Sequence, residues 1–122
     1  MKVLVCGGRS FFNWPFVRDS LDDFHLCAAP ITCVVQGGAA GADRLAKHWA
    51  EIRKIECLEY PANWDIHFRR AGYIRNREML EKNPDVEQII AFPGGEGTQM
   101  MKQIARERGL PVIEYNVEEP PF

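Results

Sequence analysis

"EQIIAFPGGEGTQMMKQIARERGLPVIEY", residues 87–115, decides the fold class of this chain. The stretch begins with a short apolar run, continues through a loop that holds three glycines, and then changes to a helical pattern over residues 98–109. Gly109 is a typical helix terminator, and Pro111 opens a second apolar run over residues 111–115. The stretch therefore predicts a strand, a helix and a second strand.

The same alternation extends over the whole chain. Together with residues 87–92 and 111–115, the apolar runs that predict strands lie at residues 2–6, 31–36 and 55–60, and the helical patterns before residue 87 lie at 14–26, 41–54 and 70–82. Short strands that alternate with helices predict a buried parallel sheet covered by helices on both faces. We expect one three-layer α/β domain over residues 1–116 and a flexible, acidic, proline-rich tail over residues 117–122.

The composition narrows the classes of function. The chain has 122 residues, a formal net charge of −2 and a hydrophobic fraction of 46%, which favours one domain with a proper core. The near-zero charge makes nucleic acid an unexpected partner. No apolar run approaches the roughly 20 residues of a membrane span, so no membrane partner is expected. The apolar run after Met1 is shorter than that of a signal peptide, and a cytoplasmic protein is expected.

Four cysteines, Cys6, Cys27, Cys33 and Cys57, lack the close spacing of a zinc site or a redox pair. Three of them lie in predicted strands, where a free thiol packs as a small apolar side chain. The sequence therefore predicts no metal site.

Loops rich in glycine follow three of the predicted strands, at residues 7–13, 37–43 and 93–98. In a parallel α/β sheet the ligand lies beyond the carboxyl ends of the strands. Glycine lets an anion approach the backbone closely, and the helix that follows offers unpaired N–H groups and a partial positive charge. The expected ligand-binding residues in these loops are Gly7, Gly8, Arg9, Ser10, Gly37, Gly38, Gly41, Asp43, Pro93, Gly94, Gly95, Gly97 and Thr98. A single loop of this kind is equally consistent with a plain tight turn.

Arginines gather between residues 69 and 77, and arginine suits a bidentate grip on phosphate. Arg75 and Arg77 are two residues apart, so at most one of them points to the site from a helix. The other interpretation is a solvated helix face. Asn76 is expected to orient a loop or a sugar. Just upstream, Trp64 offers either a stacking plane or a core aromatic side chain, and Asp65 offers a ribose acceptor.

Four motifs, "GGRSF", "GGAAGAD", "AGYIRNREM" and "AFPGGEGT", occur in this order and cover nearly the whole chain. In these motifs the chain resembles the YspA-like family of the SLOG superfamily, which also includes the Lonely guy phosphoribohydrolases and the DprA/Smf DNA-processing proteins. The resemblance implies a Rossmann-like sheet with strand order 3-2-1-4-5. It also implies a nucleotide or nucleotide-derived ligand, similar to NAD or ADP-ribose, and a possible homo-oligomer.

The resemblance leaves open whether the chain binds its ligand or cleaves it. In Lonely guy enzymes a glutamate follows the threonine of PGGxGT by three residues and is assisted by an arginine. Arg75 matches that arginine, but Met101 holds the place of the glutamate. Cleavage of an N-glycosidic bond needs a carboxylate, for which Glu96 and Asp43 are the available candidates. A further departure is Phe68, where the resemblance to YspA-like chains implies glycine.

Three hypotheses follow. The first is a sensor-like module that binds a nucleotide. The second is a nucleoside-monophosphate phosphoribohydrolase or related N-glycosidase with Arg75 and Glu96 as catalytic candidates. The third is a DNA-handling protein of the DprA type. The slight excess of acidic over basic residues argues against this hypothesis.

Overall fold

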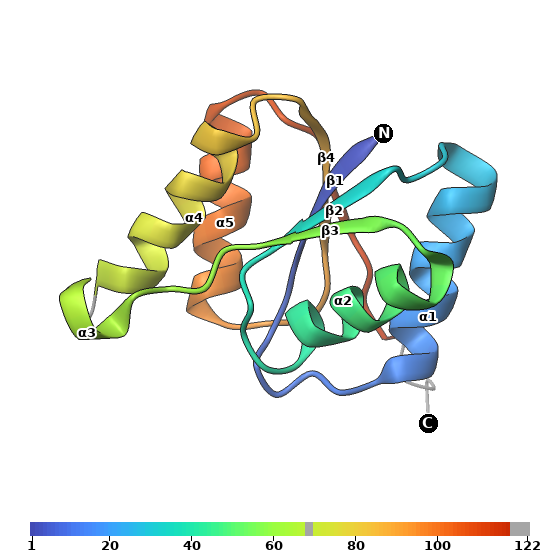
Figure 1. Cartoon of the computed structure of the whole chain (residues 1–122), viewed down its shortest axis with the longest axis horizontal. Coiled ribbons are helices and arrows are strands. Elements are labelled where there is room, and N and C mark those ends of the chain that lie inside the picture. Colours follow the sequence, from blue (N-terminus) through green and yellow to red (C-terminus); the bar gives the residue numbers. More distant parts are fainter. Residues whose placement is uncertain (68–69, 118–122) are drawn as a thin grey trace.

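The computed structural model describes residues 1–67 and 70–117 of the chain. Within these residues, five parallel strands form one sheet in the order β3-β2-β1-β4-β5 (Figure 1). The strands are β1 (Lys2–Cys6), β2 (Cys33–Gln36), β3 (Glu56–Glu59), β4 (Val86–Ala91) and β5 (Val112–Glu114). The predicted parallel sheet and its strand order are confirmed. Phe68 and residues 118–122, on which two of the expectations fall, lie outside the described residues.

Two pairs of helices cover the sheet. Helices α1 (Trp14–Asp23) and α2 (Ala42–Arg53) lie on one face, and α4 (Ala71–Lys82) and α5 (Glu96–Glu107) lie on the other (Figure 1). This arrangement confirms the three-layer α/β architecture. In the part of the chain that the structure describes, none of the helices has the length and apolar character to cross a membrane.

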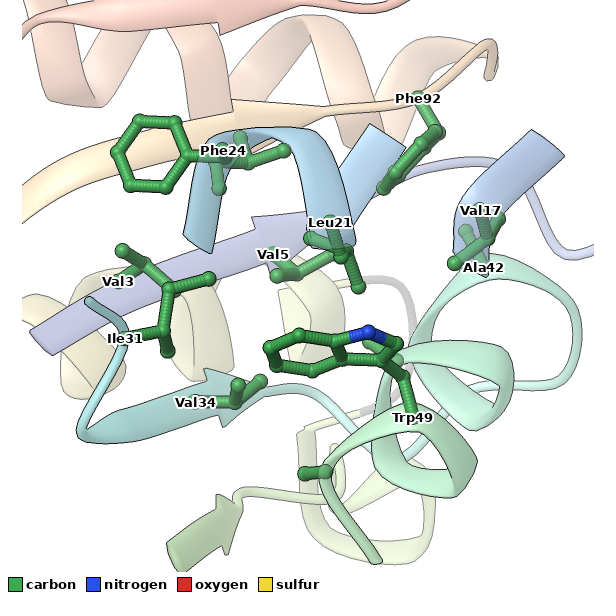
Figure 2. Close-up of a cluster of buried hydrophobic side chains, with 13 residues drawn as sticks. Val3, Val5, Val17, Leu21, Phe24, Ile31, Val34, Ala42, Trp49 and Phe92 are labelled. Carbon is green, nitrogen blue, oxygen red and sulfur yellow. The ribbon is translucent and has the colours of Figure 1, made fainter. Parts of the chain in front are cut away.

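Each face of the sheet has its own core, because successive side chains of a strand point to opposite faces. Val3 and Val5 of β1 pack with α1 and α2 around the fully buried Trp49 (Figure 2). The Trp49 indole N–H donates a 2.8 Å hydrogen bond to Asp22 Oδ1, which satisfies the polar atom of this large side chain. On the opposite face, Leu4 packs with residues of α4 and α5.

Several predicted boundaries were wrong by a few residues. The helix predicted over residues 14–26 ends as an α-helix at Asp23 and continues as one π-helical turn, η1 (Phe24–Ala28). The helix predicted to begin at Thr98 begins at Glu96, because Gly95 serves as its N-cap. The loop after β3 contains an unpredicted short helix, α3 (Trp64–His67).

The two edge strands differ from the prediction that all strands are buried. Strand β3 has both ends exposed, and β5 is only half-buried. Both have one hydrogen-bonded neighbour in the sheet, since they lie at its two edges. The termination of α5 is as predicted, because Gly109 adopts a positive φ of 72° directly after the last turn.

The loops after β1, β2 and β4 lie together at one end of the sheet, at the bottom of the view in Figure 1. Between β1 and β4 the connections change direction across the sheet, which makes this the topological switch point. The Gly8 N–H donates a 2.8 Å hydrogen bond to the Pro93 carbonyl oxygen, so the two loops are in direct contact there.

Candidate functional site

A pocket of about 400 Å³ opens at this switch point, a size typical of small-molecule sites. Most of the residues expected from the sequence line it: Gly7, Gly8, Arg9, Gly37, Asp43, Trp64, Arg75, Asn76, Gly95, Glu96, Gly97 and Thr98. Six expected residues are not part of the lining: Ser10, Gly38, Gly41, Asp65, Pro93 and Gly94.

Gly41 and Gly94 hold the loops against one another. A Cβ on Gly41 would lie 2.2 Å from the Gly8 carbonyl oxygen, and the positive φ of 78° at Gly41 disfavours any side chain. A Cβ on Gly94 would lie 2.2 Å from Thr98 Oγ1 and 2.7 Å from the Gly8 nitrogen. These two glycines therefore allow the loops after β2 and β4 to contact the loop after β1, although neither glycine lines the pocket.

The first turn of α5 forms one wall of the pocket. A Cβ on Gly95 or Gly97 would meet no atom within 4 Å, so the backbone is accessible there. The first intrahelical bond of α5 runs from Gln99 N–H to the Gly95 carbonyl, which leaves the N–H groups of residues 96–98 without a partner inside the helix. No side chain caps this end, and Thr98 is buried in the first turn of the helix.

Arg75 crosses the pocket from α4. Its Nη1 donates to the Gly37 carbonyl oxygen, and its Nε donates a 2.9 Å hydrogen bond to Asn76 Oδ1. Burial lowers the pKa of the guanidinium, and the nearby Asp43 partly offsets that effect. Arg77 bonds the Tyr73 hydroxyl at 2.9 Å, so only one of the two arginines reaches the site, as helical spacing predicts.

Asn76 is buried and joins α4 to α5, because its Nδ2 donates a 3.3 Å hydrogen bond to the Gly97 carbonyl oxygen. With Gly72 and Met79 it belongs to one face of α4 that lines the pocket. Residues 72, 75, 76 and 79 are spaced three, one and three apart, which is the period of one helical face. That spacing is a signal in the sequence by which Gly72 and Met79 could have been found.

Asp43 lies in the first turn of α2, as predicted, and is only 6% exposed. Its Oδ2 accepts a 3.3 Å hydrogen bond from the Ala39 N–H. Burial raises the pKa of the carboxyl group to about 6, against the opposing effects of backbone N–H groups and the nearby arginines. A buried carboxyl group with a raised pKa in a pocket is typical of functional sites.

Trp64 projects from α3 and is 46% exposed, which decides against a core role. The Arg9 guanidinium lies 5.0 Å from the centre of its ring, in a cation–π contact. Tyr73 also lines the pocket and is exposed, although the sequence analysis did not select it. Trp64 and Tyr73 therefore give the pocket an aromatic side.

Three residues bear on catalysis. Glu96 lines the pocket with an exposed side chain, whereas Met101 lines it as a buried apolar wall. Cys6 also lines the pocket, and burial raises its pKa to about 12, so it is a thiol at neutral pH.

Among residues 1–67 and 70–117, no group of His, Cys, Asp and Glu side chains is arranged to hold a metal ion.

Two comparisons with known proteins bear on the family of the chain. The model of the family described as "YspA, cpYpsA-related SLOG family" matches residues 1–67, which include the loops after β1 and β2. The "Gene 61 protein" of Mycobacterium phage D29 is 35% identical over 122 residues, and the similarity covers 93% of this chain and 95% of that protein. The second comparison extends over α4 and α5, which complete the pocket.

Proposed function

Because the chain belongs to the YspA, cpYpsA-related SLOG family, we propose that its pocket binds a nucleotide or nucleotide-derived ligand. The ligand's phosphate is placed at the first turn of α5. The observation that carries the proposal is that this uncapped turn and the Arg75 guanidinium line one pocket. If the chain binds this ligand without cleaving it, its role is that of a sensor-like module.

The phosphate position follows from the backbone of α5. The N–H groups of residues 96–98 have no acceptor inside the helix, and the helix dipole adds partial positive charge at this end. Gly95 and Gly97 have no side chain to keep an anion away. A phosphate here needs no lysine, which agrees with the lining of the pocket.

The side chain of Arg75 is a second argument for a phosphate at the first turn of α5. It donates to two neutral acceptors, the Gly37 carbonyl and the Asn76 side chain. A guanidinium carries five N–H donors, so these bonds leave donors for a ligand. Since burial disfavours the charged form, an anionic ligand stabilises it.

The base is placed at the aromatic side of the pocket. Trp64 presents a half-exposed ring, and a nucleobase stacks on such a ring without sequence preference among bases. The Arg9 guanidinium lies over this ring. The base therefore displaces Arg9 or stacks on the opposite side of the indole.

The second candidate function is an N-glycosidase. The burial of Asp43 favours this function, because a buried carboxyl group with a pKa of about 6 suits acid–base chemistry. Against it, Met101 presents an apolar surface to the pocket, and a thioether neither activates water nor stabilises an oxocarbenium ion. Binding is therefore the leading proposal.

One experiment tests both. The protein is incubated separately with AMP, NAD and ADP-ribose, and thermal unfolding is followed beside release of the free base. We expect at least one compound to raise the unfolding temperature without base release, since a ligand at 100 times its Kd adds about 2.7 kcal/mol of stability. Arg75→Ala should abolish the shift, whereas Arg18→Ala is the control, because Arg18 is an exposed arginine that pairs with Asp19 outside the pocket lining.

Two results would overturn the leading proposal. If none of the three compounds shifts the unfolding temperature, the nucleotide proposal fails. If the base is released and the release disappears in both Arg75→Ala and Asp43→Asn, the chain is an enzyme and the second candidate replaces the first.

A further inference from the structure

Asp43 is the one carboxylate with a buried side chain in the pocket lining, within the part of the chain that the structure describes. The Ala39 N–H donates to its Oδ2 at 3.3 Å, and a backbone contact with Gly37 also favours the ionised form. A carboxylate offers about four lone-pair positions, so these contacts leave acceptor capacity. The structure therefore contains an acceptor in the pocket wall that a phosphate site by itself does not need.

The charges around Asp43 limit what this acceptor binds. Arg75 and Arg9 are the cations that act on it; Arg75 donates a hydrogen bond to Gly37, and Arg9 lies over the ring of Trp64. Cys6 faces the same region as a neutral thiol. A phosphate next to Asp43 would be repelled. A neutral hydrogen-bond donor, such as a sugar hydroxyl, suits a buried carboxylate.

A chain of hydrogen bonds places Asp43 relative to the phosphate position. From α5, the Gly97 carbonyl accepts from Asn76, and Asn76 accepts from Arg75. Arg75 in turn donates to the Gly37 carbonyl, in the loop that Asp43 holds. Arg75 thus lies between the first turn of α5 and the loop of Asp43. A ligand whose phosphate lies at α5 therefore directs its next group, the sugar, past Arg75 toward Asp43.

We propose that Asp43 accepts hydrogen bonds from the ribose hydroxyls of the ligand, so that the pocket selects ribonucleotides over deoxyribonucleotides. This inference rests on the proposed function, because it assumes a phosphate at α5. It assigns specificity to Asp43 and not to the exposed Asp65, which is outside the pocket lining. The part of the ligand that this inference concerns is a ribose 5-phosphate unit. Both a nucleotide and a free sugar phosphate contain this unit.

The physical basis is the cost of an unpaired buried acceptor. When a 2′-deoxy ligand binds, Asp43 loses both water and its hydroxyl partner, and a site built to bond a hydroxyl discriminates strongly against its absence. We expect AMP to bind about tenfold or more tightly than 2′-deoxy-AMP, the range for a hydrogen bond to a charged group. The base contributes equally to both ligands.

The test is isothermal titration calorimetry at pH 7.5 with AMP, 2′-deoxy-AMP, 3′-deoxy-AMP and ribose 5-phosphate. In the natural protein, AMP should bind more tightly than 2′-deoxy-AMP by about tenfold or more, and 3′-deoxy-AMP shows whether the 3′-hydroxyl is also bound. In Asp43→Asn, AMP and 2′-deoxy-AMP should bind within about twofold of each other, while Asp65→Asn should keep the discrimination. A purely structural role of Asp43 would weaken all the ligands alike and leave their ratio unchanged. Ribose 5-phosphate that binds as tightly as AMP identifies a sugar phosphate as the ligand.

Two outcomes overturn the inference. Equal affinity of the natural protein for AMP and 2′-deoxy-AMP shows that the pocket does not select ribonucleotides, while binding itself upholds the proposed function. Discrimination that survives in Asp43→Asn but disappears in Asp65→Asn moves the role to Asp65. If none of the four ligands binds the natural protein, the proposed function fails and the inference fails with it. The comparison in the natural protein does not depend on the folding of any variant.

Discussion

Arg75 Nη1 donates to the carbonyl oxygen of Gly37, a residue 38 positions earlier in the chain. The contact joins α4 to the loop after β2 across the pocket. It depends on the absence of a side chain at Gly37, because a Cβ there would lie 2.2 Å from Nη1. Gly37 therefore sets the position of the arginine that we assign to the phosphate.

Gly37→Ala should displace Arg75 without removing its charge. The atom in conflict is the end of a flexible side chain, so the free energy of unfolding should change little. Affinity for AMP should fall by about tenfold or more, because hydrogen bonds to charged groups contribute roughly 1.5–3 kcal/mol. Calorimetric titration beside urea unfolding checks both parts. Gly109→Ala is the control, since it strains a positive φ at the end of α5 without any pocket contact. A Gly37→Ala variant that binds AMP normally would contradict the assignment.

Gly41→Ala should destabilise the fold itself. An added Cβ meets the Gly8 carbonyl oxygen at 2.2 Å and the Arg9 carbonyl oxygen at 2.6 Å, and the φ of 78° is unfavourable for alanine. Backbone clash and strain together are expected to cost roughly 2–4 kcal/mol. Gly97→Ala is the matched comparison, because a Cβ there meets nothing within 4 Å inside α5, and it should leave stability equal or slightly higher. Equal unfolding midpoints in urea for the two variants would show that the loop contact is not needed.

The sequence predicts the sheet well because it depends on local periodicity. Runs such as residues 87–92 have the length and composition of buried strands, and Gly109 marks the end of a helix by its own conformational preference. The π-helical turn after Asp23 and the short helix at Trp64 were not predictable in this way. They depend on how the chain packs after α1 and β3, which local patterns do not encode.

The candidate site was predictable in its position and only partly in its details. Parallel topology brings the glycine loops to one end of the sheet, whatever their side chains do. The different roles of the glycines were not predictable from the sequence. Gly94 packs against Thr98, whereas the position of a Cβ on Gly97 is unoccupied, and only the fold distinguishes the two. The burial of Asp43 was equally hidden, since a carboxylate in a first helical turn is usually solvated.

Gly95→Asp should separate fold stability from ligand binding. Aspartate is a better N-cap than glycine and interacts favourably with the helix dipole, so α5 should be stabilised by about 0.5–1 kcal/mol. The same charge competes with a phosphate at this turn and should weaken AMP binding by about tenfold or more at low salt. Gly95→Asn is the neutral control of similar shape. Titrations at two salt concentrations check the difference. Equal binding by the aspartate and asparagine variants would exclude a phosphate near residue 95.

Asp43 should make the stability of the ligand-free protein depend on pH. Its folded-state pKa of about 6 lies above the usual 3.8, so the folded protein takes up this proton before the unfolded chain does. The free energy of unfolding therefore gains up to about 2–3 kcal/mol from this group as pH falls from about 6.5 to 4. Arg75, Arg9 and Cys6 face Asp43, and the Cys6 thiol keeps its proton throughout that range because burial raises its pKa. Partnered carboxylates such as Asp22, whose pKa is lowered by Arg53, lose their contribution only at lower pH.

Urea unfolding of the natural protein and Asp43→Asn at pH 7 and pH 4.5 measures this effect. The asparagine variant lacks the titration, so its stability relative to the natural protein should fall by about 2 kcal/mol between the two pH values. Groups that Asp43→Asn leaves unchanged contribute equally in both proteins and cancel from the difference. A difference that does not change with pH would show that Asp43 is solvated.

The crystal structure of the protein with AMP tests the central claim most directly. The account predicts phosphate oxygens within about 2.7–3.2 Å of the backbone nitrogens of Gly97 and Thr98, with Arg75 beside them. AMP bound outside this pocket, with the first turn of α5 in contact with protein atoms or solvent alone, would contradict it.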